Sequence, residues 1–277
     1  MEDFTPFEMM ILTAAKQIKD GDALFIGFHW PMVASRVARR LHAPEIYCVY
    51  EGGGVERTYC PVMPNTGADL ILSPHLAFAG ETYDTLCGFL AAGHLPLSMI
   101  DAPMVDRFGN INSTCIGPYQ QPKARLAGSG GAADLGANSR KLFMLSDRTT
   151  KDGFPARVDY VTTPGYLDGF DSRIKAGFRP DTGPEMIISS LGVFKFEPAS
   201  KEAYLWGVYP NADVEKIKAG VGWELKVAER LESIPAPKAE EIKIVREELD
   251  IAESRLWKIP GREKLDRGPR FEGRGKN

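Results

Sequence analysis

Residues 46–54 read Ile-Tyr-Cys-Val-Tyr-Glu-Gly-Gly-Gly, so an apolar run meets one acidic residue and then three glycines. β-Branched and aromatic residues favour strands, and this run predicts a strand over Ile46–Tyr50. The glycines allow another backbone or a ligand to approach closely. Glu51 is therefore expected at the carboxyl end of a strand, where open α/β sheets bind their ligands. The alternative for Glu51 is a solvated loop acid with no chemical role.

The segment before this strand has the pattern of a β-α-β unit. Apolar residues recur at helical spacing over Thr5–Lys19, and Asp20-Gly21-Asp22 ends this helix. Ala23–Phe28 is predicted as a buried strand, and Pro31–Leu41 as a helix with proline in its first turn. Two strands joined by a helix predict parallel pairing within one sheet.

The alternation of strands and helices continues along the chain. Strands are predicted at Asp69–Leu72, Leu97–Asp101, Lys141–Ser146, Met186–Phe196, Ala203–Val208 and Glu224–Ala228, and helices at Glu81–Ala92, Asp213–Ala219 and Lys238–Leu249. This order indicates an α/β fold with a largely parallel open sheet and helices on both of its faces.

The middle of the chain interrupts this order with an inserted hairpin and loop region. Met104–Gly117 is predicted as two short strands joined by a turn at Gly109-Asn110. Residues 148–184 are rich in Gly, Pro, Thr and Asp, which predicts loops and one strand, Val158–Thr162. Long irregular connections of this kind often carry binding contacts.

The length of 277 residues and the apolar content of 43% suit one large domain or two small ones. We expect a single α/β domain over residues 1–255 and a basic extension over residues 256–277. A net charge of −3 provides no electrostatic footprint for nucleic acid. No run approaches the ~20 apolar residues that cross a bilayer, and the acidic start Met1-Glu2-Asp3-Phe4 is unlike a signal peptide. We therefore expect a cytoplasmic protein without membrane contact.

The sequence predicts no metal site and no disulfide framework. The cysteines are dispersed without a C-x-x-C pair, and three histidines lack the spacing of metal ligands. These residues are Cys48, Cys60, Cys87 and Cys115, with His42, His75 and His94. Buried or incidental free thiols are the expected state, because free cysteine packs as a small apolar residue.

Four motifs in this order carry a resemblance to a known family. They are Tyr50-Glu51-Gly52-Gly53, Val105-Asp106-Arg107-Phe108-Gly109-Asn110-Ile111-Asn112, Gly128-Ser129-Gly130-Gly131-Ala132-Ala133-Asp134 and Ser189-Ser190-Leu191-Gly192-Val193-Phe194. Together they resemble the β subunit of family I coenzyme A transferases, nearest the glutaconate CoA-transferase type, over residues 5–250.

The resemblance implies an enzyme that transfers coenzyme A between an acyl-CoA and a carboxylic acid. It implies a homologous α subunit, an active site between the two subunits and Glu51 as the nucleophile that forms a glutamyl-CoA thioester. Coenzyme A is then a substrate, and no cofactor is bound permanently. The sequence departs from the glutaconate-type pattern in having Gly52 where Ser usually follows the glutamate.

The remaining candidate residues would bind substrate or CoA beside Glu51. Gly52 and Gly53 belong to its turn, and Gly128-Ser129-Gly130-Gly131 precedes a predicted helix over Ala132–Ser139. Backbone N–H groups of that loop can stabilise an oxyanion, although an ordinary strand-to-helix turn is the alternative. Asn112 either contacts substrate or bonds its own turn. His29 follows the first strand and either binds an acyl carboxylate or fills the crevice.

Two other functions remain open from the sequence. One is an acyl-CoA or ring-opening hydrolase on the same scaffold, with the glutamate as a base acting on water. The other is a small-molecule sensor, although no helix-turn-helix segment precedes the sheet. Arg57 either pairs with Glu56 or holds a second carboxylate of the substrate. The acyl donor and acceptor and the subunit stoichiometry are left undetermined.

Overall fold

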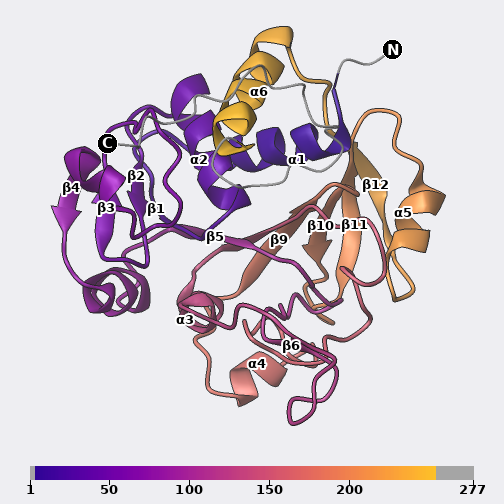
Figure 1. Ribbon diagram of the computed structural model, residues 1–277. Coiled ribbons are helices and arrows are strands. Elements are labelled where there is room, and N and C mark those ends of the chain that lie inside the picture. The colour runs from indigo at the N-terminus through magenta and orange to yellow at the C-terminus, as the bar shows by residue number, and fades with distance from the viewer. Residues whose placement is uncertain (1–3, 254–277) are drawn as a thin grey trace, which may run out of the picture.

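The computed structural model describes residues 4–253, and the predicted basic extension at 256–277 lies outside the described residues. Ten strands form one sheet in the order β12-β11-β10-β9-β8-β5-β1-β2-β3-β4 (Figure 1). The helices and strands of the chain follow the α/β order that the sequence predicts. Within the described residues, no helix is both long and apolar enough to span a membrane.

The central strands are parallel, as predicted. β1 (Ala23–Ile26) pairs with β2 (Tyr47–Val49) and β5 (Leu97–Asp101), β5 pairs with β8 (Leu142–Ser146), and β8 pairs with β9 (Pro184–Ser189). Alternate residues of these strands belong to two apolar clusters, one on each face. Both faces are buried, as in other parallel sheets that helices cover.

One face of the sheet is covered by α1 (Pro6–Ala15), α2 (Trp30–Leu41) and α6 (Ala239–Glu253), which contact one another (Figure 1). A buried ion pair joins α2 to α6, with Arg36 Nε 2.6 Å from Glu248 Oε2. The other face packs against η2 (Asp84–Ala91), which is a π-helix, and against α3 (Ala132–Asn138) and α5 (Val214–Gly220). Helices therefore lie on both faces, as the sequence predicts.

Antiparallel strands extend both edges of the parallel centre. β3 (Gly54–Glu56) and β4 (Leu76–Ala79) follow β2, and β10 (Val193–Phe196) pairs antiparallel with both β9 and β11 (Ala203–Val208). β11 pairs parallel with β12 (Val227–Ser233). β6 (Cys115–Ile116) and β7 (Ala124–Arg125) form a separate pair, and α4 (Ser172–Lys175) lies in the long connection.

Two strand predictions outside the inserted region are wrong. Asp69–Leu72 begins the 3-10 helix η1 (Leu70–His75), because the Asp69 carboxylate accepts a hydrogen bond from the Ile71 N–H and caps the turn. The strand predicted at Met186–Phe196 is two strands, β9 and β10, and the chain reverses between them. Gly192 has a positive φ of 152° there, and the Ser189 N–H donates to its carbonyl.

The inserted region has less regular structure than predicted. The turn at Gly109-Asn110 is present, but its hairpin is reduced to one bridge between Val105 and Ile111. The Asp106 carboxylate accepts hydrogen bonds from the N–H groups of Phe108 and Asn110, so a side chain replaces the ladder of a longer hairpin. Residues 158–162 form no strand, and a single bridge joins the next residue, Thr163, to Ile111.

The connectivity of the parallel strands creates a crevice beside β1. From β1 the chain passes through α2 to β2, which pairs with one edge of β1. The strand β5, which comes later in the chain, pairs with the other edge of β1. Gly27 follows β1, and a Cβ at this position would lie 2.8 Å from the Met99 carbonyl of β5. Ligands of open α/β sheets bind where the direction of winding reverses in this way. The carboxyl ends of β1 and β5 are thus the expected place for a site.

Candidate active site

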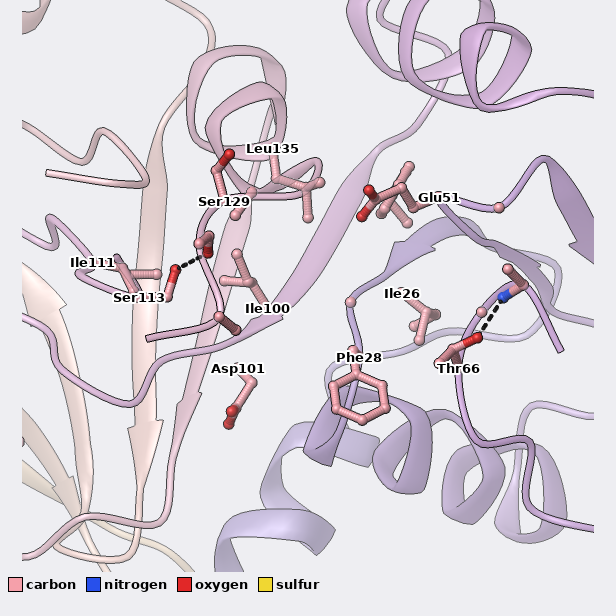
Figure 2. A pocket seen from close by; sticks show the side chains of 18 of the residues that line it. Ile26, Phe28, Glu51, Thr66, Ile100, Asp101, Ile111, Ser113, Ser129 and Leu135 are labelled. Atoms are coloured by element: carbon pink, nitrogen blue, oxygen red, sulfur yellow. Dashed lines mark hydrogen bonds between the residues drawn. The ribbon is translucent and has the colours of Figure 1, made fainter. Parts of the chain in front are cut away.

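A cavity of about 640 Å³ lies at the carboxyl ends of β1 and β5 (Figure 2). Its walls also come from the β2–β3 turn, the loop before η1 and the loop that leads into α3. Lining residues include Phe25, Ile26, Phe28, Glu51, Gly52, Thr66, Ile100, Asp101, Ile111, Ser113, Gly128, Ser129 and Leu135. Most of these side chains are apolar, so ligand atoms inside the cavity are partly removed from water.

Glu51 occupies a tight turn between β2 and β3, where the Gly53 N–H donates to the Tyr50 carbonyl at 3.1 Å. Its carboxylate points into the cavity toward the loop that carries Ser129 (Figure 2). A Cβ at Gly130 or Gly131 would lie 3.1 Å from a Glu51 carboxylate oxygen, which places that loop directly against the acid. Among residues 4–253, no hydrogen bond or ion pair engages this carboxylate, which leaves it available to a ligand.

The glycines after Glu51 shape its turn. Gly52 lines the cavity, and a Cβ there would lie 2.6 Å from the Ala68 side chain. Gly53 has a φ of +94°, and its Cβ would lie 2.2 Å from the Gly80 carbonyl oxygen. Gly53 does not line the cavity. Both glycines therefore permit close backbone packing, which fixes the turn that presents Glu51.

A buried hydrogen-bond network stabilises this turn. The Tyr50 hydroxyl donates to the Glu56 carboxylate at 2.6 Å, and the Cys60 N–H donates to its other oxygen at 3.3 Å. Burial raises the pKa of Tyr50 well above its usual value, and the charge of Glu56 raises it further. Of the two roles considered for Arg57, pairing with Glu56 is wrong, because Arg57 pairs with Glu45.

The predicted glycine loop borders the cavity beside Glu51. Gly128 and Ser129 line the cavity, and Gly131 is the residue before α3. Paired hydrogen bonds of 2.8 Å anchor the loop, from the Gly128 N–H to the Ser113 carbonyl and from the Ser113 hydroxyl to the Gly128 carbonyl. Gly128 and Gly130 have positive φ angles of 94° and 45°, so a residue with a side chain would strain this path.

Asn112 and His29 do not line the cavity. Asn112 is fully buried, its amide donates to the Cys115 carbonyl at 2.7 Å, and its oxygen accepts from the Thr114 N–H at 3.0 Å. The geometry favours the turn-forming interpretation of Asn112. His29 caps α2 with a φ of +75°, and its Nδ1 lies 3.2 Å from the Asp101 carboxylate.

The sequence alone did not identify Asp101, the last residue of β5, which lines the cavity between strand and loop. Burial raises the pKa of Asp101, and its contact with His29 opposes that shift. The position of Asp101 at the carboxyl end of a predicted strand is the feature of the sequence that could have identified it as a cavity residue. Ser113 and Phe28 were also missed, because nothing local marks them as cavity residues. Within residues 4–253, no group of three or more His, Cys, Asp or Glu is placed to hold a metal ion.

The arrangement of fold and site defines a class of α/β enzyme. A free carboxylate on a glycine turn enters an apolar cavity at the point where the winding reverses, and a second glycine loop meets it. Such a carboxylate can act as a nucleophile or as a base on a reactive carbonyl.

Comparison with known proteins identifies the family. The model of the coenzyme A transferase family matches residues 7–220, and the chain belongs to this family. The B subunit of glutaconate CoA-transferase from Acidaminococcus fermentans is 33% identical, over 90% of this chain and 95% of that protein. The crystal structure of glutaconate coenzyme A-transferase from the same organism superposes with a TM-score of 0.83 at 30% identity, covering 93% of this chain and 99% of the matched chain.

Other relatives are named for a different substrate or a different reaction. The B subunit of 3-oxoadipate CoA-transferase from Pseudomonas knackmussii is 29% identical, over 89% of this chain and 94% of that protein. A more distant relative, the cholesterol ring-cleaving hydrolase IpdB subunit of Mycobacterium tuberculosis, is 25% identical over 89% of this chain and 95% of its own length. The family match and the two CoA-transferase relatives make the chain a CoA transferase subunit of the B, or β, type.

Proposed function

We propose that this chain transfers coenzyme A between an acyl-CoA and a carboxylic acid through a thioester on Glu51. The observation that carries the proposal is the Glu51 carboxylate, which projects from a glycine turn into an apolar cavity of about 640 Å³. Coenzyme A serves as a substrate, and no permanently bound cofactor takes part. The surroundings of the carboxylate suit this chemistry, because it has no competing partner among the described residues.

Each chemical step conserves the energy of the thioester. Glu51 attacks the acyl-CoA carbonyl, expels the CoA thiolate and forms a mixed anhydride. The thiolate then attacks the glutamyl carbonyl, which releases the acyl group as a carboxylate and leaves CoA on Glu51. An incoming carboxylic acid attacks this thioester, and the same steps in reverse give the new acyl-CoA.

Both attacks on carbonyl carbon create an oxyanion that needs hydrogen-bond donors. Gly130 and Gly131 lie directly against the Glu51 carboxylate, and we assign the backbone N–H groups of Ser129, Gly130 and Gly131 to this role, because the Gly128 N–H already donates to the Ser113 carbonyl. Positive φ angles at Gly128 and Gly130 support the assignment, because they turn the backbone in a way that other residues adopt at a cost. Gly52, Gly53, Asn112 and His29 act indirectly, by shaping the turn or the cavity wall.

We further propose that a homologous α subunit completes the active site. The two CoA-transferase relatives are named as B subunits, which supports a second chain. Phe28 in the cavity lining is 53% exposed, so the cavity opens to solvent and a partner has room to cover the substrate. We expect this complex in the cytoplasm, where acyl-CoA and free carboxylic acids meet.

The test combines product analysis with substitutions of Glu51. The complex with its α subunit is given acyl-CoA with and without an acceptor acid, and free CoA and new acyl-CoA are quantified. Transfer predicts new acyl-CoA that depends on the acceptor, whereas free CoA accumulating without an acceptor would support hydrolysis. Glu51→Asp shortens the side chain by about 1 Å and is expected to cost on the order of 10²-fold in rate. Wild-type activity in Glu51→Ala would contradict the proposal.

A further inference from the structure

The side chain of Ser113 lies where the cavity wall meets the glycine loop. Figure 2 shows Ser113 beside the loop that carries Ser129, and both residues line the cavity. The Ser113 hydroxyl donates to the Gly128 carbonyl at 2.8 Å, and the Gly128 N–H donates to the Ser113 carbonyl at the same distance. Gly128 directly precedes the three residues whose N–H groups we assign to the oxyanion. The paired bonds therefore hold the start of that segment.

The rest of the loop is held mainly at its far end. Gly128 has a φ of +94°, and within residues 4–253 no atom beyond its chain neighbours lies within 4 Å of the place that its Cβ would take. At the other end, a Cβ at Gly131 would lie 3.1 Å from the Leu86 side chain of η2. The loop is thus packed against η2 after Gly130, whereas at Gly128 its position depends on the bonds to Ser113.

Ser113 is itself fixed by the buried part of the inserted region. The Ser113 N–H donates to Thr162 Oγ1 at 3.0 Å, and the Thr162 side chain belongs to a residue that is 5% exposed. The Thr162 N–H donates in turn to the Ile111 carbonyl at 2.9 Å. The residue before Ser113 is Asn112, whose side chain closes a buried turn. The hydroxyl of Ser113 can therefore give the loop a defined position relative to the core.

We propose that Ser113 is a positioning residue, whose bond to Gly128 holds the backbone N–H groups of residues 129–131 in place. The inference rests on the proposed function, in which these groups stabilise the oxyanion that forms when Glu51 reacts. Hydrogen-bond donors stabilise such a charge best when they are already oriented before it develops. Because this contact strengthens in the transition state, its loss should lower kcat and leave KM nearly unchanged.

The test measures transfer by the complex with its α subunit, with acyl-CoA as donor and acetate as acceptor. Ser113→Ala removes the hydroxyl and leaves the backbone bond to Gly128 in place. We expect kcat to fall about tenfold, which is less than the ~10²-fold or greater loss expected when an oxyanion donor is removed outright, and KM to stay within about twofold. Ser113→Thr keeps a hydroxyl and is expected to restore most of the wild-type kcat.

Ser172→Ala is the matched control. The Ser172 hydroxyl also donates to a glycine carbonyl, that of Gly169, at 2.6 Å, and Gly169 likewise has a positive φ of 83°. Ser172 lies in α4, outside the cavity lining, so this variant is expected to keep the wild-type kcat. Urea unfolding of both variants compares their stabilities. Should Ser113→Ala not fold, Ser113→Cys supplies a weaker donor of similar shape and is expected to lower kcat severalfold.

Three results would overturn the inference while leaving transfer through Glu51 intact. They are a wild-type kcat in Ser113→Ala, or in Ser113→Cys if that variant is the one measured; a loss in Ser113→Ala that is confined to KM; and equal losses of kcat in Ser113→Ala and Ser172→Ala. Absence of transfer by the wild-type complex would instead count against the proposed function itself.

Discussion

The substitution Gly130→Ala tests whether the glycine loop sets the position of the Glu51 carboxylate. The new Cβ would lie 3.1 Å from Oε1 and 3.2 Å from Oε2 of Glu51, closer than ordinary contacts, so the carboxylate must shift by a few tenths of an ångström. A misplacement of about 1 Å can cost 10²-fold in rate, so we expect thioester formation to slow by about threefold to tenfold. Single-turnover mixing with acyl-CoA measures this step.

The same substitution also strains the backbone, because Gly130 has a φ of +45°. Gly177→Ala is the matched control, since Gly177 has a φ of +89° and no atom within 4 Å of its added Cβ. Each variant is expected to lose about 1–2 kcal/mol of stability in urea unfolding. Only Gly130→Ala should slow the reaction. An equal rate in Gly130→Ala and wild type would refute the assigned contact between this loop and Glu51.

Three further predictions concern Tyr50, Asp101 and the cysteines. Tyr50→Phe removes a hydrogen-bond donor from buried Glu56 and should lower the free energy of unfolding by about 1–3 kcal/mol in urea titrations, and no loss would contradict the network. Burial raises the pKa of Asp101, so the native state binds the proton of this carboxyl more tightly than the unfolded state does. The contribution of Asp101 to the free energy of unfolding therefore falls as pH rises from about 3.8 to the pKa of Asp101 in the native state. The stability of Asp101→Asn relative to wild type should therefore rise over that interval, and a constant difference would contradict the shift. Burial raises the pKa of Cys48 to about 12, so thiol reagents should modify the exposed Cys87 first in the native chain, as peptide mass mapping would report.

The place of Glu51 could be predicted because its signals are local. A strand of β-branched and aromatic residues ends at the acid, and glycines follow it without a break. The structure adds that the turn joins β2 to the antiparallel strand β3, which begins at the third glycine. A glycine-rich segment has weak strand propensity, so only tertiary pairing could reveal β3.

Asp101 could not be recognised as a cavity residue, because its neighbours are distant in sequence. Its contact with His29 spans 72 positions and exists only because β5 pairs with β1. The closeness of Gly130 to Glu51 is likewise a tertiary contact. Asn112 illustrates the opposite case, since its side chain bonds to residues two and three positions away, as its turn sequence suggests.

The irregular region was hardest to predict because side chains replace the backbone ladder there. Asp106 binds the N–H groups of its own turn, and Asp69 caps η1 in the same manner. Asp69 stands before an apolar run, Leu-Ile-Leu, whose composition alone favours a strand. Single capping contacts therefore determined elements that the apolar pattern could not distinguish.

The most direct measurement is identification of the residue that carries coenzyme A as a thioester. The complex with its α subunit is incubated with acyl-CoA without an acceptor, treated with hydroxylamine, digested and sequenced by tandem mass spectrometry. We predict a hydroxamate on Glu51 that disappears when an acceptor acid is added before hydroxylamine. An unmodified Glu51 in a complex that transfers coenzyme A, or a hydroxamate on another residue, would contradict the assignment of Glu51 as the nucleophile.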